Sequence, residues 1–343
     1  MSQFYSKQAK LDANEGKVDY IELGFLGEDT TLSVKIAVHN GNNLFSYIVD
    51  EKELIFYDAS LPMASFAVGN PILFPFPNRI EDAMYAWKDT TYLQKKNGIP
   101  IQLHSLVYDE TSFEKTDIIT DKQSITLKTT LDVDETHPIY KGYPFSFRLY
   151  ISYILSADGL TIEYILKNKC DEDMPYGMAF HPYFNKINGD KNTTIHVPCQ
   201  YYYETRNDVE PEFFNKMPGG FGMTGNILPT GNLLSVSDTK HDIMIPTAVG
   251  DLDVDTVYTN LEKNPIAQID YKDSDIKLSI SGSQEFCHYV VYTPKGKDFF
   301  CIEPQTCSTD AINLFNQGIK HVNLLTCPPS GDKKGFVKYT ITK

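Results

Sequence analysis

The stretch of sequence that decides the fold runs from residue 145 to residue 166 and reads FSFRLYISYILSADGLTIEYIL. Apolar side chains occupy every second position from Phe145 to Leu155 and again from Leu160 to Leu166. Because side chains in a β-strand point alternately to its two faces, each half of the stretch predicts a strand with one apolar face. The intervening Ala157-Asp158-Gly159 contains an Asp-Gly pair, which is typical of tight turns. The stretch therefore predicts a β-hairpin.

Alternation with the same period recurs along the chain. It is found in Thr31–His39, Ser124–Val133, Ile276–Ser281 and Val337–Thr342. Two further apolar runs, Phe286–Thr293 and Phe299–Glu303, are separated by Pro294-Lys295-Gly296-Lys297, which predicts a second hairpin. No helical spacing of apolar residues extends beyond two turns, and strands do not alternate with helices. This pattern predicts an all-β fold, a large antiparallel β-sandwich.

Nothing in the sequence marks a boundary between domains. The 343 residues contain no internal repeat, no Pro- or Gly-rich linker and no shift in composition. A chain of this length can hold two domains, but large β architectures often remain single. We therefore expect one sandwich domain, residues 1–343.

The charge balance excludes several classes of partner. The chain has 31 Lys and Arg residues against 45 Asp and Glu residues, a net charge of −14, and only Arg79, Arg148 and Arg206 are arginines. Without a basic run, neither nucleic acid nor an anionic membrane is an expected partner. The N-terminus lacks an apolar signal sequence, and no segment reaches the ~18 apolar residues of a membrane span, so a cytoplasmic location is predicted.

The cysteines and histidines show no metal-binding spacing. The chain has six cysteines and no Cys-x-x-Cys motif or paired histidines. Reduced thiols are therefore expected, and no metal or other cofactor is predicted.

Two segments in the first third of the chain carry candidate site residues. Arg79 follows two prolines in Phe74–Ile80, FPFPNRI, where a stiff backbone places a guanidinium that can bind ligand oxygens. A surface salt bridge is the alternative role for Arg79. His104 lies among apolar residues in Ile101–Leu106, so it is either a ligand-contacting residue or a structural histidine of the core.

Two later segments contain groups suited to proton transfer. His181 is followed by proline in Gly177–Asn185, GMAFHPYFN, and is expected at a strand end that enters a rigid loop. Imidazole exchanges protons near neutral pH, although a structural role is also open. Glu303 ends the apolar run Phe299–Ile302. If it is buried, desolvation raises its pKa and makes it a base near pH 7; otherwise it faces water at a strand edge.

Taken in order, these motifs resemble the aldose 1-epimerase (galactose mutarotase) family. The matching residues are Asn78-Arg79-Ile80, Leu103-His104, His181–Asn185, Asp255-Thr256-Val257-Tyr258 and Ile302-Glu303-Pro304. The resemblance extends from about residue 70 to 315, and His-Pro-Tyr-Phe-Asn and Ile-Glu-Pro are its most specific parts. It implies a large antiparallel β-sandwich with the site in a cleft on one sheet.

The resemblance also implies a role for each residue. Glu303 matches the general base that removes the proton of the anomeric hydroxyl, and His181 matches the general acid that protonates the ring oxygen. Arg79, His104 and Asp255 match residues that contact the sugar, although Asp253 lies near enough to take the place of Asp255. The implied reaction is isomerisation of a small aldose without cofactor or metal.

Two loops depart from the family pattern. The chain reads Ser105-Leu106-Val107 where many members have Gly-Gly after the Leu-His pair, and Glu81-Asp82-Ala83 follows Asn-Arg-Ile. These differences affect residues that line the cleft, so they bear on which sugar is preferred more than on the acid–base pair.

The sequence is therefore compatible with three functions. The leading one is epimerisation of a free hexose. A hexose-phosphate 1-epimerase needs extra cations, which Lys95 and Lys96 are placed to supply. A non-catalytic sugar-binding or regulatory protein is the third possibility, against which the joint presence of His104, His181 and Glu303 argues.

Overall fold

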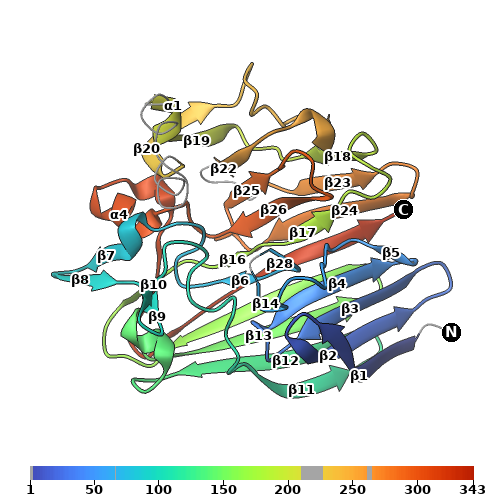
Figure 1. Cartoon of the computed structure of the whole chain (residues 1–343), viewed down its shortest axis with the longest axis horizontal. Coiled ribbons are helices and arrows are strands. Elements are labelled where there is room, and N and C mark those ends of the chain that lie inside the picture. Colours follow the sequence, from blue (N-terminus) through green and yellow to red (C-terminus); the bar gives the residue numbers. More distant parts are fainter. Residues whose placement is uncertain (1–2, 66, 210–226, 261–264) are drawn as a thin grey trace.

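The fold of the protein, in a computed structural model, is built almost entirely from antiparallel strands (Figure 1). The structure describes residues 3–65, 67–209, 227–260 and 265–343. In these ranges the sheets are accompanied by two short α-helices, α1 (Arg206–Val209) and α4 (Ala311–Asn316). The same residues form four 3₁₀ turns, at Glu81–Ala83, Pro138–Lys141, Val249–Asp251 and Lys320–Val322. Within the described ranges, no helix is long and apolar enough to cross a membrane.

The largest sheet has nine strands, and the hairpin predicted from residues 145–166 lies within it. Its two strands pair from Phe147↔Asn168 to Ser156↔Gly159, which leaves Ala157 and Asp158 as the loop and confirms the prediction. Across the sheet the strands are β11 (Glu114–Thr120), β12 (Ser124–Val133), β13 (Phe147–Ser156), β14 (Gly159–Asn168), β28 (Asp332–Thr342), β24 (Ile276–Gly282), β23 (Ala267–Tyr271), β18 (Thr193–His196) and β21 (Thr247–Ala248).

The second sheet has eight strands and contains the other predicted hairpin. Its two arms, β25 (His288–Tyr292) and β26 (Phe299–Gln305), pair antiparallel, which confirms that prediction. A seven-strand path runs across it, and the short strand β17 (Tyr183–Asn185) pairs with β26 beside that path. In order, the path is β20 (Pro229–Ser235), β19 (Tyr201–Thr205), β22 (Asp255–Thr259), β25 (His288–Tyr292), β26 (Phe299–Gln305), β16 (Ala179–Phe180) and β6 (Ile72–Leu73).

A five-stranded sheet from the N-terminal part continues the layer of the second sheet. Isolated bridges Leu44↔Asn70 and Ile55↔Phe184 connect the two. Its strands are β1 (Gln3–Ala13), β2 (Gly16–Leu26), β3 (Thr31–Ala37), β4 (Asn43–Val49) and β5 (Lys52–Glu53). Three two-stranded pairs complete the fold: β7 (Met84–Trp87) with β8 (Thr90–Leu93), β9 (Lys95–Lys96) with β10 (Ile99–Pro100), and β15 (Met174–Tyr176) with β27 (Leu325–Cys327).

One apolar core joins the two layers. It contains Val34 of β3, Leu127 of β12, Leu278 of β24 and Ile302 of β26, all essentially inaccessible to solvent. The all-β prediction of a large antiparallel sandwich is therefore confirmed. None of the six cysteines forms a disulfide.

Strand β26 explains how this fold places a carboxylate inside the protein. Its alternate residues Phe300 and Ile302 belong to the core between the sheets. Cys301 and Glu303 therefore point to the opposite face, since neighbouring strand residues face opposite ways. That face is also covered, because both residues are buried.

Candidate active site

His181 lies in the two-residue break between β16 and β17, as the sequence predicted for a strand end that enters a rigid loop. Its backbone N–H donates to the Pro71 carbonyl at 3.0 Å, and the N–H of Tyr183 donates to the Gly69 carbonyl at 2.9 Å. The imidazole stacks on the Tyr183 ring at a centroid distance of 4.6 Å and is almost fully buried. The ring is therefore held in one orientation.

Glu303 faces this imidazole from the middle of β26. Its Oε1 lies 3.2 Å from His181 Nε2, and its Oε2 accepts a hydrogen bond from Gln305 Nε2 at 3.1 Å. Only 2% of the residue is exposed. Glu303 is thus not the strand-edge residue facing water that the sequence left open.

Burial determines the protonation of the pair. It raises the pKa of the Glu303 carboxyl well above its usual range, and the Asp255 carboxylate adds to the rise. A hydrogen bond from Gln305 and the charge of Arg79 oppose that shift. Burial also lowers the pKa of the His181 imidazole. Desolvation therefore disfavours charge on both groups, and their polar atoms are close enough to exchange a proton.

His104 contacts the His181 ring. It lies in a loop that is hydrogen-bonded through its backbone to the segment 78–80. Its backbone N–H donates to the Asn78 carbonyl at 2.6 Å, beside a bridge between Arg79 and Leu103. The two imidazole rings meet edge to face at 4.9 Å. Burial, with the nearby His181 and Arg79, lowers the pKa of His104 well below its usual value, so this ring is neutral.

The backbone around His104 has conformations that side chains rarely adopt. Asn78, His104 and Ser105 have φ angles of 61°, 59° and 67°. For residues other than glycine, such angles cost on the order of 1 kcal/mol or more and are found where the surroundings enforce them. The Ser105 hydroxyl accepts a hydrogen bond from the Phe76 N–H at 3.1 Å, which helps to enforce the loop.

Arg79 and Asp255 form the more exposed side of the site. Their side chains are 17% and 34% exposed, and Arg79 Nη2 lies 3.6 Å from Asp255 Oδ2. Arg79 Nη1 also donates to Asn78 Oδ1 at 2.8 Å, while its buried Nε has no hydrogen-bond partner among the described residues. Asp253, the other aspartate considered, instead pairs with Lys295 at 3.0 Å on the surface.

The structure therefore brings all five predicted residues together. His104 and Glu303 contact His181 directly, while Arg79 and Asp255 contact each other and act on this pair through their charges. Sequence reasoning missed Tyr183, which stacks on His181, and Gln305, which donates a hydrogen bond to Glu303. A signal for both was present. Each lies two positions from a predicted residue in an extended segment, and such positions share a strand face.

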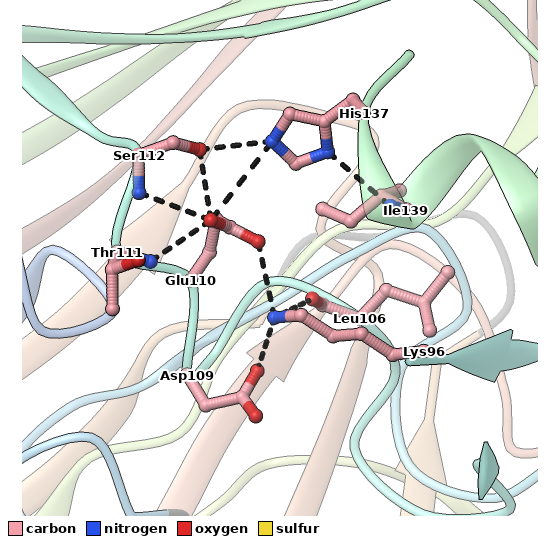
Figure 2. A network of polar contacts seen from close by, with 8 residues as sticks. All are labelled: Lys96, Leu106, Asp109, Glu110, Thr111, Ser112, His137 and Ile139. Atoms are coloured by element: carbon pink, nitrogen blue, oxygen red, sulfur yellow. Dashed lines mark hydrogen bonds and ion pairs between the residues drawn. The ribbon is translucent and has the colours of Figure 1, made fainter. Parts of the chain in front are cut away.

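Lys96, one of the two lysines placed to serve the phosphate alternative, is already bound in a polar network (Figure 2). Its ammonium contacts Asp109 Oδ1 at 2.6 Å and Glu110 Oε2 at 3.1 Å, and donates to the Leu106 carbonyl at 3.0 Å. Only 11% of its side chain is exposed. Lys96 therefore serves as the shared counter-ion of two carboxylates of the protein and fixes the segment that follows His104.

The same network contains a serine and a histidine, but their hydrogen bonds exclude a nucleophile. His137 Nδ1 accepts from the Ile139 N–H at 3.2 Å, so the proton of the neutral ring is on Nε2 and points to Ser112 Oγ at 2.9 Å. The serine hydroxyl donates in turn to Glu110 at 2.8 Å. Because His137 donates to the hydroxyl, it cannot remove its proton.

Fold and site together define a β-sandwich protein with a buried histidine–glutamate pair. A sequence model of the aldose 1-epimerase family matches residues 26–219, more than half of the chain. The chain therefore belongs to the aldose 1-epimerase family. Membership supports a sugar epimerase or mutarotase activity, an isomerase reaction on a small sugar.

Solved structures share this fold along the whole chain. A galactose mutarotase-like protein from Clostridium acetobutylicum is 19% identical with a TM-score of 0.80, and the match covers 99% of each chain. A galactose 1-epimerase from Lactobacillus acidophilus is 15% identical with a TM-score of 0.70 and the same coverage. An aldose epimerase homologue from C. elegans is 17% identical with a TM-score of 0.68, covering 100% of this chain and 99% of that one. At these identities the likeness establishes the fold.

Proposed function

We propose that the protein is an aldose 1-epimerase that interconverts the α and β anomers of a free hexose, with Glu303 as general base and His181 as general acid. The observation that carries this proposal is the 3.2 Å contact between Nε2 of His181 and Oε1 of Glu303 inside the protein. The two reacting oxygens of a cyclic sugar are bonded to the same carbon, so the acid and the base must be neighbours.

In this proposal the pair carries a single proton, which matches the proton count of the reaction. In the reactive form the proton is on His181 and Glu303 is ionised. Glu303 takes the proton of the anomeric hydroxyl, the C1–O5 bond breaks with its electron pair going to O5, and His181 delivers its proton there. The pair still holds one proton, now on Glu303.

Ring closure reverses the two roles. The open-chain aldehyde rotates about its C1–C2 bond and presents its other face to the ring hydroxyl. His181 removes the proton of that hydroxyl as O5 attacks C1, and Glu303 returns a proton to O1. General acid–base catalysis of this kind contributes typically about 10²–10⁴-fold. The scheme requires no cofactor and no metal.

Arg79, His104 and Asp255 hold the sugar hydroxyls in this proposal. Arg79 and Asp255 are partly exposed, so a sugar can reach them from solvent. The neutral ring of His104 lies against His181 and offers a further hydrogen-bonding edge. Positioning by such contacts supplies the part of the rate enhancement that proton transfer does not.

The occupied state of Lys96 favours a free sugar over a sugar phosphate. A phosphate dianion needs cations that are not already neutralised. Lys96 is bound to Asp109 and Glu110, and Arg79 lies beside Asp255. A cytoplasmic location, consistent with reduced thiols, forms part of the same proposal.

Polarimetry on freshly dissolved anomers tests this function. We expect the protein to accelerate mutarotation of at least one free hexose and to act poorly on the corresponding 6-phosphates. Preference for phosphorylated sugars would favour the hexose-phosphate alternative. Sugar binding without acceleration would instead identify a non-catalytic sugar-binding protein.

A further inference from the structure

Cys301 is a buried thiol that the proposed reaction does not use. It lies on β26, two residues before Glu303, and faces the same side of the strand. On the neighbouring strands it stands opposite Tyr292 and Tyr183. None of its surface is exposed, and it forms no disulfide.

This thiol completes a compact group of three atoms that bind metals. One ring nitrogen of His181, the sulfur of Cys301 and one carboxylate oxygen of Glu303 all lie within 4.8 Å of one another. Metal bonds of about 2.0–2.3 Å at tetrahedral angles place ligand atoms roughly 3.3–3.8 Å apart. To bind a metal, the three side chains therefore need to approach one another by no more than the difference between 4.8 Å and that spacing.

The chemistry of the three atoms selects the kind of ion. Imidazole nitrogen and thiolate sulfur suit Zn²⁺ and Co²⁺, whereas Mg²⁺ and Ca²⁺ prefer oxygen ligands throughout. A thiolate and a carboxylate together neutralise a divalent cation, so the complex brings no net charge into this buried site. Three protein ligands leave a fourth tetrahedral position for water or a sugar hydroxyl.

We propose that His181, Cys301 and Glu303 form a zinc-binding site, and that zinc bound there inhibits the epimerase. Zinc occupies the imidazole nitrogen and the carboxylate that exchange protons with the sugar, so bound metal and catalysis exclude each other. The inhibitory part of this inference rests on the proposed function, while the binding part rests on the three atoms alone.

The sequence conceals this site because its ligands come from distant segments. His181 lies between β16 and β17, whereas Cys301 and Glu303 lie on β26, and strand pairing between β17 and β26 brings them together. Zinc motifs are recognised by close spacing of cysteine and histidine, which is missing here.

Cobalt binding provides a test that is independent of sugar turnover. The full-length protein is stripped with a chelator, dialysed and titrated with Co²⁺ while its absorption spectrum is recorded. We expect one Co²⁺ per chain, with a thiolate-to-cobalt band in the near ultraviolet and the visible bands of tetrahedral cobalt. Zinc should displace the cobalt and abolish both signals. The absence of a thiolate band in the wild-type protein would overturn the proposal.

Three cysteine variants locate the ligand. Cys301→Ser removes the sulfur and should abolish the thiolate band. Cys287→Ser is a matched control, since Cys287 is also buried and its sulfur lies 3.3 Å from His288 Nδ1. Cys170→Ser removes the partly exposed thiol that is the obvious adventitious ligand. Both controls should retain the band, and a band that survives in Cys301→Ser would refute the assignment.

The rate of mutarotation is then measured with and without zinc, and each variant is compared with its own rate in the absence of zinc. Zinc should slow wild-type mutarotation, and Cys301→Ser should need at least about 10²-fold more zinc for the same inhibition, because it lacks a direct ligand. Activity that is lost on chelation and restored by zinc would overturn the inhibitory role. If no sugar turnover is found but the cobalt spectra behave as expected, the metal site stands and the proposed function falls.

Discussion

Two histidine–glutamate clusters in this molecule differ in how completely their polar atoms are paired. Glu110, in the network of Figure 2, receives hydrogen bonds from the Thr111 and Ser112 N–H groups and from the Ser112 hydroxyl, and it contacts Lys96. In the described part of the chain, the Glu303 carboxylate has polar contacts with two side chains, those of Gln305 and His181.

The histidines show the same difference. His137 Nδ1 accepts from a backbone N–H and its Nε2 lies against a serine hydroxyl. His181 Nδ1 is buried and, within the described part of the chain, has no hydrogen-bond partner in another residue. A fully paired cluster stabilises the fold, whereas an incompletely paired one retains capacity for a ligand.

The pairing gives the two glutamates opposite pKa shifts. Burial by itself raises the pKa of Glu110, but Lys96 and the Ser112 hydrogen bonds outweigh it and lower the pKa below the usual value. Burial prevails at Glu303 and raises its pKa. A buried glutamate next to a histidine is therefore not in itself a catalytic signal; what distinguishes the two sites is the number of donors around the carboxylate.

Removing the proposed acid should have the largest effect. Asparagine at position 181 can still donate a hydrogen bond to a ring oxygen but cannot deliver a proton. His181→Asn should lower the turnover number by about 10²–10⁴-fold with little change in sugar affinity. Polarimetry gives the rate and equilibrium titration gives the affinity. His137→Asn, in the paired cluster, is the control. Its correctly folded fraction should retain most of the wild-type turnover number.

Removing the central cation of the paired cluster should cost stability. Lys96→Met keeps the length of the side chain but leaves Asp109 and Glu110 without their counter-charge. We expect a loss of about 2–4 kcal/mol in the free energy of unfolding, measured by urea titration. Lys88→Met breaks the exposed pair with Glu172 and serves as the control, with a loss below about 1 kcal/mol. Equal losses would show that the network contributes no more than a surface pair.

Neutralising the two glutamates should change stability in opposite directions at pH 8. Glu110→Gln should lower the free energy of unfolding by about 1–3 kcal/mol, because the charged form is hydrogen-bonded. Glu303→Gln should raise it by about 1 kcal/mol, because the charged form is disfavoured by burial. A loss of stability in both variants would show that the two carboxylates are equivalent.

The pH dependence of these two effects follows from linkage. The lowered pKa of Glu110 gives stability that is present above its usual value of 4.5 and is lost as the pH falls through the folded-state value. The raised pKa of Glu303 costs stability as the pH rises above 4.5. The cost of Glu110→Gln should therefore shrink in acid, while the gain from Glu303→Gln should grow as the pH rises.

The smallest effect is expected at Asp253. Its side chain is 60% exposed, and its partner Lys295 is more exposed still. Asp253→Asn should change the free energy of unfolding by less than about 1 kcal/mol and leave mutarotation unchanged. A large loss of activity would show that Asp253, rather than Asp255, contacts the sugar.

Strand pattern made most of the fold predictable. The hairpins β13–β14 and β25–β26 follow from period-two alternation interrupted by turn residues, because burial of one strand face enforces that period. The pairing of β17 with β26 was not predictable in this way. It joins residues more than a hundred positions apart, and short fully buried strands carry no alternation that specifies a partner.

The candidate site was predictable by residue type but not by environment. Proline-bounded His181 and the isolated Glu303 stand out in apolar surroundings. The sequence does not reveal that Lys96 forms ion pairs with Asp109 and Glu110, because that pairing depends on how β9 packs against the loop that contains the two acids. The same limitation left Asp253 and Asp255 equivalent until the position of Arg79 was known.

A double-mutant cycle on the buried pair tests the central claim most directly. Turnover of the best free hexose is measured for wild type, Glu303→Gln, His181→Asn and the double variant, with sugar affinity determined for each. If the two side chains act together through one shared proton, the double variant should lose about as much turnover as the worse single variant. Losses that multiply, or that appear as weakened sugar binding with turnover intact, would contradict the account.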